Sequence, residues 1–248
     1  MVRKMKTKIW AHRGFSYIAP ENTMEAFELA ANHKADGIEL DIHLTADNNL
    51  AVFHDDWLSR ITKTDGMIEE CTMDYLKTLD ASYIHSKYRG AKIPTLEEVF
   101  DFMKGNDLML NIELKEGHEC NSKFALRVAE VEKQFNFQNR VMYSSFNHYT
   151  LMNLKKLLPH SKVGILYEAG LIEPWHYAKK IGADCIHPYW RIGMMGQGIK
   201  EAQKLGLEVN LWTVDDDKDI KTLLDEGADG IITNRPDLAI KLREEIQK

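Results

Sequence analysis

Two stretches of this sequence, E-L-D-I-H-L and L-N-I-E-L-K, place carboxylates where they can act together. Because side chains alternate along a strand, Glu39 and Asp41 share one face of the first stretch, and Glu113 shares a face of the second with Lys115. The apolar residues between them must face a core, which leaves the carboxylates toward the axis of a barrel. Buried carboxylates need a cation or hydrogen-bond donors.

Oxygen ligands without a nearby cysteine favour a hard ion over zinc. We therefore predict that Glu39, Asp41 and Glu113 bind one divalent metal ion, Mg²⁺ or Ca²⁺. Lys115 lies two residues beyond Glu113, where its ammonium group can reach a phosphoryl oxygen beside the metal. A salt bridge between Lys115 and the carboxylates is an equally good interpretation for the enzyme without substrate.

His12 and His54 are the candidates for proton transfer. His12 ends the first apolar run, in A-H-R-G, and the carboxyl ends of barrel strands supply catalytic groups. Arg13 beside it is a natural bidentate donor to phosphate. A hairpin with a four-residue turn, Ala46–Asn49, pairs His54 with Asp41, so that both histidines flank one phosphorus. A lone histidine at either position would more often be structural.

The elements that position these residues alternate along the chain. Apolar runs predict strands at Lys8–Ala11, Gly37–Leu44, Leu108–Leu114, Val141–Ser145, Val163–Tyr167, Asp184–His187, Leu207–Trp212 and Gly230–Thr233. Helical periodicity predicts helices at Thr23–Asn32, Leu96–Lys104, Lys123–Phe135, Tyr149–Leu158, Gln197–Leu205, Asp217–Glu226 and Pro236–Ile246. This alternation indicates a covered parallel sheet, and we predict a closed (β/α)₈ barrel. A doubly wound sheet is less favoured because no strand leads into G-x-G-x-x-G.

Two places break the alternation. The run Leu50–His54 is predicted to fold back antiparallel on Leu40–Leu44. The stretch Asp55–Ile93 has weak periodicity and is too long for an ordinary barrel loop, so we predict a small inserted lobe over the active face. The domain organisation expected is a single catalytic domain over residues 1–248, with residues 55–93 inserted in it.

Charge and composition limit the partners. The formal net charge is −6, and no basic block could follow a nucleic acid backbone, so nucleic acid is an unlikely partner. Cys71, Cys120 and Cys185 are widely separated and are interpreted as ordinary thiols in a reducing compartment. No stretch is long and apolar enough to span a bilayer, and the N-terminus lacks the apolar core of a signal peptide. We predict a cytoplasmic protein without stable membrane insertion, and homo-oligomer formation stays open.

Taken together and in order, the motifs are more specific than any one of them. H-R-G, P-E-N-T, E-L-D-I-H-L-T-x-D, V-F-H-D, I-P-T-L-E-E-V, N-I-E-L-K, W-T-V-D and D-G-I-I-T-N-R-P resemble the glycerophosphodiester phosphodiesterase family from His12 to Pro236. The resemblance implies a TIM barrel with one divalent ion. It implies metal ligands at Glu39, Asp41 and Glu113, acid/base histidines at His12 and His54, and phosphate contacts from Arg13 and Lys115.

The family also places aromatic residues at the barrel mouth, and here these are Trp212 and Phe146. We interpret Trp212 as a wall for the glycerol or the alcohol, whereas barrel packing explains Phe146 equally well. At Asn234 an aspartate is common in the family, and the family varies around His43, so we expect structural or supporting roles for both. Asn22 is explained by capping of a helix, and contact with phosphate is secondary.

The predicted reaction is metal-dependent hydrolysis of glycerophosphodiesters to glycerol 3-phosphate and an alcohol. One histidine removes a proton from the nucleophile, and the other protonates the leaving alcohol. Two alternatives stay open: a barrel phosphodiesterase for lysophospholipids or phosphoinositides, and a protein that binds phosphodiesters without turnover. The first would need an apolar docking ridge that residues 55–93 do not supply, and the second would need no acid/base pair. The preferred alcohol, the metal and the nucleophile, water or a glycerol hydroxyl, stay open as well.

Overall fold

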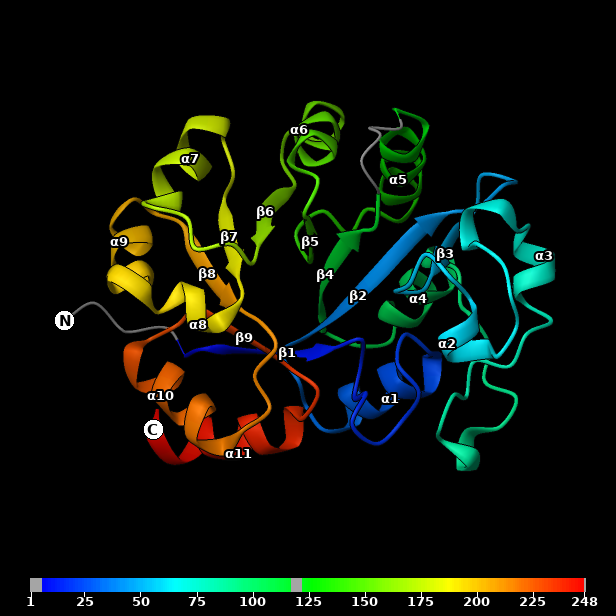
Figure 1. Cartoon of the computed structure of the whole chain (residues 1–248), viewed down its shortest axis with the longest axis horizontal. Helices are drawn as coiled ribbons and strands as arrows, with labels where there is room; N and C mark the ends of the chain where they lie inside the picture. Colours follow the sequence, from blue (N-terminus) through cyan, green and yellow to red (C-terminus); the bar gives the residue numbers. More distant parts are fainter. Residues whose placement is uncertain (1–5, 117–121, 248) are drawn as a thin grey trace.

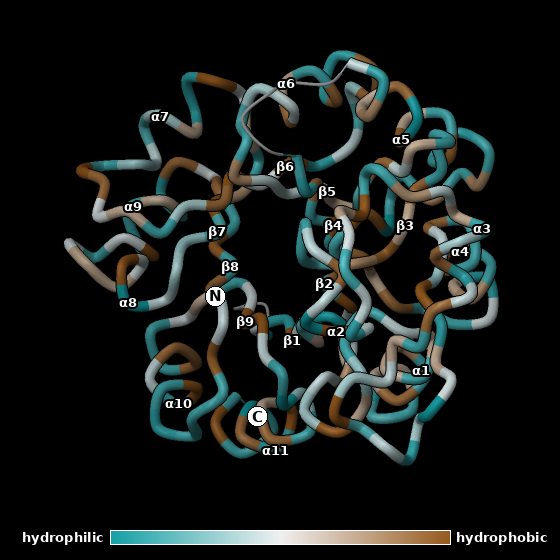
Figure 2. Tube along the Cα trace, turned by 45° about the vertical axis from the view of Figure 1, so that its right-hand side comes forward, coloured by the Kyte–Doolittle hydropathy of each residue, from teal (hydrophilic) through white to brown (hydrophobic). Residues whose placement is uncertain are grey.

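The computed structural model describes residues 6–116 and 122–247, and its strands form one continuous sheet. Figure 2 shows the strands arranged as a ring with the helices outside it. The strands in the described ranges are β1 Lys8–His12, β2 Gly37–Leu44, β3 Leu50–Val52, β4 Met109–Leu114, β5 Val141–Ser145, β6 Lys162–Tyr167, β7 Cys185–Pro188, β8 Glu208–Leu211 and β9 Gly230–Thr233.

All of these strands except β3 close a parallel barrel. The order around the sheet is β1-β9-β8-β7-β6-β5-β4-β2, and pairing of β1 with β2 joins its two ends. Every pairing in this ring is parallel. Each predicted apolar run forms one of the barrel strands, with ends that differ by no more than one residue. The predicted (β/α)₈ TIM barrel is therefore confirmed.

Helices cover the outside of the barrel (Figure 1). The α-helices in the described ranges are α1 Met24–Asn32, α2 Ser59–Thr62, α3 Met73–Leu76, α4 Leu96–Met103, α5 Ser122–Phe135, α6 His148–Leu157, α7 Pro174–Ile181, α8 Trp190–Gly193, α9 Gly198–Lys204, α10 Asp217–Glu226 and α11 Pro236–Ile246. Short 3₁₀ turns lie at η1 Ile68–Glu70, η2 Ser86–Tyr88 and η3 Met195–Gln197. The seven predicted helices are present, and the described ranges add four that were not predicted, the short α2, α3 and α8 and the longer α7. Pro174 and Ala178 of α7 are buried, and Trp175 and Ile181 pack against the core while staying partly exposed.

β2 positions the ends of two other strands. β4 pairs along one edge of β2. On the other edge, β1 pairs with the first half of β2, where His12 lies opposite Glu39, and antiparallel β3 pairs with the second half, where Ile42 lies opposite Val52. β1 and β3 therefore run toward each other along the same edge. The residue that ends β1, His12, and the chain that leaves β3 toward His54 meet over the middle of β2.

The register of the hairpin differs by one position from the prediction. The predicted turn, Ala46–Asn49, pairs His54 with Asp41. In the structure Leu44 is paired with Leu50, and the N–H of Phe53 donates to the Asp41 carbonyl oxygen at 3.0 Å. Phe53 therefore lies opposite Asp41, and the predicted pairing of His54 was wrong.

Side-chain hydrogen bonding explains the longer turn. Thr45 leaves the ladder, and its Oγ1 accepts the N–H of Asn49 at 2.9 Å. Asn48 adopts a left-handed φ of 59°, which asparagine tolerates better than most residues. The turn thus has five residues instead of four, and every later position of β3 moves by one. His54 still reaches the site, because β3 has ended before it and strand alternation no longer directs its side chain.

The side chains of β2 separate by polarity as predicted. Ile38, Leu40 and Ile42 are fully buried in the main core with the surrounding helices. Glu39 and Asp41 alternate with them and are also buried, so they face the barrel interior. The alternation predicted from the sequence therefore places carboxylates in a setting from which water is largely excluded.

Residues 53–95 connect β3 to α4, and we refer to them as the β3–α4 segment. They include α2, η1, α3 and η2, and buried apolar residues such as Leu58, Ile68 and Leu76 pack together within them. Figure 1 shows α2 and α3 beside β2 and β3, at one side of the barrel. The organisation as one domain with an inserted lobe at residues 55–93 stays a prediction.

Two general features complete the description. Cys71 and Cys185 are free thiols, and Cys120 lies outside the described residues. Across residues 6–116 and 122–247, no helix combines the length and the apolar character needed to cross a bilayer.

Candidate active site

Three carboxylates meet where the middle of β2 lies beside the carboxyl end of β4. Glu39, Asp41 and Glu113 each offer an oxygen atom, and these atoms all lie within 4.8 Å of one another. Strand pairing brings them together, because Asp41 lies directly opposite Glu113. All three side chains are buried, and Asp41 Oδ1 has no hydrogen-bond donor in the described part of the chain. An unpartnered oxygen among buried carboxylates fits a hard divalent cation.

The electrostatics of the cluster also favour a cation. Burial, followed by the nearby Asp41 and Glu113, raises the pKa of Glu39 well above its usual value. Burial, followed by Asp41, raises the pKa of Glu113 to about 7. Burial acts in the same direction on Asp41, but Arg13 and Lys115 help to hold the pKa of this carboxyl below its usual range. The anionic forms of Glu39 and Glu113 are therefore destabilised, and a cation between the carboxylates would relieve this.

Two cationic side chains accompany the carboxylates. Arg13 Nε lies 3.4 Å from Asp41 Oδ2, and the Arg13 backbone N–H donates to Glu39 Oε2 at 3.1 Å. Lys115 Nζ donates to Glu113 Oε1 at 2.9 Å and lies 3.9 Å from Asp41 Oδ1. The salt-bridge interpretation of Lys115 therefore describes the protein without substrate. Although it lies close to Asp41, the buried Arg13 Nε makes no hydrogen bond with the described residues, so this donor is available to an anionic ligand.

His12 is held by a chain of hydrogen bonds from the end of β9. Its Nδ1 lies 2.7 Å from Asn234 Oδ1, while Asn234 Nδ2 donates to Asp215 Oδ2 at 2.6 Å. Asn234 thus turns its oxygen toward His12, so Nδ1 must carry the proton and Nε2 the lone pair. Nε2 lies 3.9 Å from Glu39 Oε2. Burial, followed by Arg13, lowers the pKa of His12 to about 4, so the ring is neutral at pH 7.

His54 is held in the same tautomer. Its Nδ1 donates to Asp55 Oδ1 at 2.6 Å, and its Nε2 lies 3.3 Å from Lys115 Nζ. The His54 carbonyl oxygen accepts from His43 Nε2 at 3.1 Å, so His43 holds the backbone of His54. Burial lowers the pKa of His54. Both histidines therefore direct Nε2 toward the charged groups of the site.

Asn22 does not cap a helix, contrary to the prediction. It adopts a φ of 56°, and the N-cap of α1 is Thr23, whose side chain accepts the N–H of Ala26. Asn22 Nδ2 donates to Asp41 Oδ2 at 2.8 Å, and Asn22 Oδ1 accepts the Asp41 N–H at 3.3 Å. The helix begins one residue later than expected, which frees Asn22 to fix the Asp41 carboxylate.

Trp212 and Phe146 contact each other at the ends of β8 and β5. Their rings meet edge to face at 5.6 Å between centroids, and Tyr189 lies 5.9 Å from Trp212. Trp212 Nε1 donates to the His187 carbonyl oxygen at 2.7 Å. Phe146 is 47% exposed, so core packing does not account for it. These aromatic residues contact one another, whereas the charged residues form a separate group on β1, β2 and β4.

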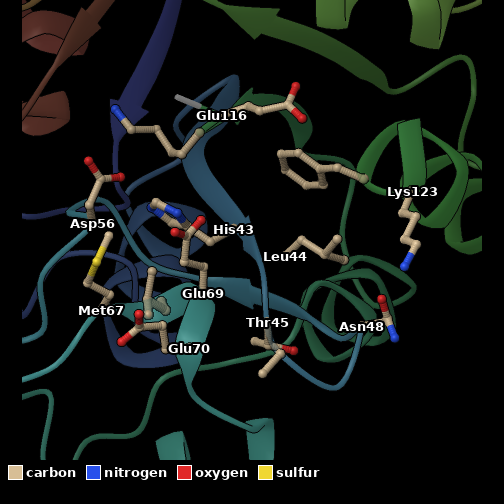
Figure 3. Close-up of a pocket in the computed structure, with 14 residues that line it drawn as sticks. His43, Leu44, Thr45, Asn48, Asp56, Met67, Glu69, Glu70, Glu116 and Lys123 are labelled. Carbon is tan, nitrogen blue, oxygen red and sulfur yellow. The ribbon is translucent and has the colours of Figure 1, made fainter. Parts of the chain in front are cut away.

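A cavity of about 570 Å³ opens beside the charged residues (Figure 3). His43 and Lys115 line it from the side of the site. Asp56, Glu69 and Glu70 line it from the β3–α4 segment. The cavity therefore extends from His43 and Lys115, which lie beside the carboxylate cluster, to an acidic wall formed by that segment.

Comparison with known proteins gives the family. Residues 12–238 match the model of the glycerophosphoryl diester phosphodiesterase family. The chain belongs to this family. It is 41% identical to a glycerophosphodiester phosphodiesterase of Caldanaerobacter subterraneus subsp. tengcongensis, over 96% of this chain and 98% of that protein. It is 40% identical to one of Bacillus altitudinis, over 97% of this chain and all of that protein. The predicted enzyme class is therefore confirmed.

Solved structures of family members agree with the fold. An Oleispira antarctica phosphodiesterase, solved in complex with its product sn-glycerol-3-phosphate, superposes with a TM-score of 0.91 at 29% identity. The match covers 96% of this chain and 97% of that one. A Parabacteroides distasonis glycerophosphodiester phosphodiesterase gives a TM-score of 0.87 at 31% identity, over 99% of this chain and all of that one.

In this glycerophosphodiester phosphodiesterase, sequence reasoning did not single out three carboxylates that hold the predicted residues. Asp215 orients Asn234, Asp55 accepts from His54, and Glu21 Oε1 accepts from Arg13 Nη1 at 2.7 Å. These carboxylates surround the predicted site residues. The structure brings the following predicted residues together: His12, Arg13, Glu39, Asp41, His54, Glu113 and Lys115. Each supporting carboxylate lies inside a motif of the sequence, W-T-V-D, V-F-H-D or P-E-N-T, and this was the available signal.

Proposed function

We propose that this enzyme hydrolyses glycerophosphodiesters to glycerol 3-phosphate and an alcohol, with one divalent metal ion, His12 and His54. The observation that carries the proposal is the tautomer of the two histidines. Each donates from Nδ1 to a fixed acceptor, Asn234 or Asp55, and turns Nε2 toward the carboxylate cluster. A pair of neutral imidazoles with directed lone pairs suits proton transfer on both sides of a phosphorus.

Glu39, Asp41 and Glu113 are the proposed metal ligands. The unpartnered Asp41 Oδ1 and the raised pKa of Glu113 both support binding of a cation between these carboxylates. When bound, Mg²⁺ or Ca²⁺ supplies charge that stabilises the anionic phosphoryl group in the transition state. Asn22 keeps Asp41 in the orientation that this binding requires, because it contacts both the carboxylate and the backbone of that residue.

Arg13 and Lys115 are the proposed donors to the phosphoryl oxygens. Both side chains are largely buried and lie against Asp41, so their charges act in a medium less polar than water. Arg13 offers the buried Nε–H that has no acceptor in the described structure. Binding of a phosphodiester would thus give this N–H a hydrogen-bond acceptor.

The histidines are assigned to different steps. His12 Nε2 carries a free lone pair, so we assign His12 as the base that takes the proton of the nucleophile. His54 Nε2 lies 3.3 Å from the Lys115 ammonium group, so we assign His54 to protonation of the leaving alcohol: Nε2 takes a proton from Lys115 as it passes one to the alcohol oxygen, and the neutral Lys115 regains a proton from solvent before the next turnover. Trp212 and Phe146 are assigned to the wall that the organic part of the substrate contacts.

Release of glycerol 3-phosphate is supported by the Oleispira antarctica relative, which was solved with that product. The cavity of Figure 3 suits the alcohol, because it starts at Lys115 and His43 and reaches the β3–α4 segment.

The test is release of glycerol 3-phosphate from glycerophosphocholine by the metal-stripped enzyme, with and without added Mg²⁺ or Ca²⁺. We expect no turnover after exhaustive chelation and recovery on adding metal. Glu113→Ala should weaken metal binding in calorimetry, whereas Glu130→Ala, which removes an exposed carboxylate of α5, should not. Full turnover by the stripped enzyme, or unchanged turnover by His12→Ala, would contradict the proposal.

A further inference from the structure

Arg60 lies in the β3–α4 segment and joins two carboxylates that sit behind the active site. Its Nε and Nη2 donate to Asp55 Oδ2 and Oδ1 at 2.5 and 3.0 Å. Its Nη1 and Nη2 donate to Glu21 Oε2 and Oε1 at 2.9 and 2.7 Å. The guanidinium group thus forms two bidentate pairs at once and uses four of its five N–H groups. A lysine ammonium group cannot form two bidentate pairs of this kind.

Each of these carboxylates also binds a residue of the proposed chemistry. Asp55 Oδ1 accepts from His54 Nδ1 at 2.6 Å, and Glu21 Oε1 accepts from Arg13 Nη1 at 2.7 Å. One continuous chain therefore runs from His54 through Asp55, Arg60 and Glu21 to Arg13. Its two ends are the proposed acid and a proposed phosphate donor, which must keep a fixed distance for reaction at one phosphorus.

We propose that Arg60 is a positioning residue that sets the relative placement of His54 and Arg13, and this rests on the proposed function of those two residues. Arg60 does not act on substrate itself. Its side chain is 37% exposed, and within residues 6–116 and 122–247 no hydrogen bond joins it to either histidine or to the carboxylate cluster. It acts through Asp55 and Glu21. Burial acts to raise the pKa of Asp55, but the hydrogen bonds from Arg60 and His54 outweigh it and lower this pKa to about 2, so Asp55 stays ionised.

A simpler role for Arg60 would be to anchor the β3–α4 segment on the barrel. Lys77, which directly follows α3, offers a matched comparison, because its ion pair with Glu98 of α4 also links the segment to the barrel. That pair lies outside the chain of contacts to His54 and Arg13. If anchoring were the whole role, loss of Lys77 and loss of Arg60 would have similar consequences for catalysis.

The kinetic test uses the full-length, metal-loaded enzyme with glycerophosphocholine. We expect Arg60→Ala to lower kcat by about 10- to 100-fold with a smaller change in KM, as is typical when the partner of a catalytic group is removed. Arg60→Lys should recover only part of kcat, because one ammonium group cannot hold both carboxylates. Lys77→Ala should keep kcat within about twofold of the wild type, since a surface pair contributes little. Equal losses in Arg60→Ala and Lys77→Ala would overturn the proposal.

A double-mutant cycle locates the effect. If Arg60 acts through Asp55, Arg60→Ala should lower kcat less in the Asp55→Asn background than in the wild type. Fully additive effects would show that Arg60 acts elsewhere. Thermal unfolding of each variant identifies any loss that comes from unfolded protein.

A second readout does not depend on turnover. The His54 Nδ1 proton, assigned by its loss in His54→Gln, should give a slowly exchanging resonance in wild-type protein because Asp55 holds it. The resonance should broaden or vanish in Arg60→Ala and persist in Lys77→Ala, and its persistence in Arg60→Ala would overturn the proposal. If the wild type released no glycerol 3-phosphate from any glycerophosphodiester, the proposed function would fail, while this measurement would still decide the role of Arg60.

Discussion

Asn234 determines which nitrogen of His12 faces the active site. An aspartate at this position could accept the Nδ1 proton through either oxygen, but an asparagine must be oriented by a further group. Asp215 supplies that orientation, because it accepts both the backbone N–H and the side-chain Nδ2–H of Asn234. Ser16 Oγ also donates to Asn234 Oδ1 at 2.7 Å. The neutral side chain of Asn234 therefore orients His12, and the Asp215 carboxylate in turn orients Asn234.

Removal of the amide should affect catalysis more than folding. We expect Asn234→Ala to lower kcat by about 10- to 100-fold, because His12 loses the acceptor that fixes its tautomer. Steady-state kinetics with glycerophosphocholine measures this. Asp217→Ala is the control, since it removes a carboxylate from the first turn of α10 without touching Asn234. A kcat for Asn234→Ala within twofold of the wild type would contradict the assigned role.

At the scale of elements, the β2–β3 hairpin determines where His54 lies. Its five-residue turn follows from the Thr45 side chain and from the left-handed conformation of Asn48. Deleting Asn48 should shorten the turn, shift the register by one residue and displace His54. We expect a loss in kcat of about 100-fold or more, because small misplacements of catalytic groups are costly.

The matched control keeps the length of the turn. Asn48→Gly should retain near-normal kcat, since glycine adopts the same left-handed φ without strain. Circular dichroism should show that both variants are folded. Equal activity of the deletion and of Asn48→Gly would show that the register does not position His54.

The sequence predicts the strands well because their physical signal is local. Alternation along β2 is enough to place Glu39 and Asp41 on the buried face, and the order of motifs along the chain is enough to bring Glu113 beside them. The register of β3 was not predictable in this way, because it depends on a hydrogen bond from Asn49 to the side chain of Thr45.

Contacts between distant residues are the least accessible to sequence reasoning. Glu21 and Arg60 lie 39 positions apart, and no periodicity in residues 55–93 indicates that they meet. Asn22 was assigned to a helix cap because asparagine is common there, whereas the left-handed conformation of Asn22 gives the cap to Thr23. Such positions require the folded chain, even when the motif that contains them has been noticed.

At the scale of the whole molecule, a buried histidine should limit stability in acid. His187 is fully buried in the barrel, where its ring nitrogen Nε2 accepts from Asn210 Nδ2 at 2.9 Å. Burial lowers the pKa of His187 to about 4, while Glu208 acts weakly in the other direction. The unfolded chain takes up this proton below about pH 6.5, and the folded protein does so only near pH 4. The stability linked to His187 is therefore present above pH 6.5 and is lost as the pH falls toward 4.

The expected size is measurable. Between pH 7 and pH 5, His187 should lower the free energy of unfolding by about 2 kcal/mol. Urea denaturation of the wild type and of His187→Gln at both pH values tests this, because the variant lacks the titrating ring. The variant should lose less stability over this interval, whatever its stability at pH 7. An identical loss in both proteins would assign the acid sensitivity to other groups.

The acidic wall of the cavity in Figure 3 has a consequence for the arrival of substrates from solution. Asp56, Glu69 and Glu70 make this wall acidic, while Lys115 and Lys123 line other parts of the cavity. A substrate whose cationic alcohol lies against the acidic wall is attracted where a neutral one is not. Dissolved salt screens such attraction beyond about 10 Å at 0.1 M ionic strength.

The ratio of kcat/KM for glycerophosphocholine to that for glycerophosphoglycerol should therefore fall as ionic strength rises, while effects on their shared phosphate group cancel. The double variant Glu69→Gln, Glu70→Gln should show a flatter ratio, and parallel salt curves in the wild type would refute the idea. If the ratio does fall, the ionic strength of the surroundings helps to choose which headgroup this enzyme removes.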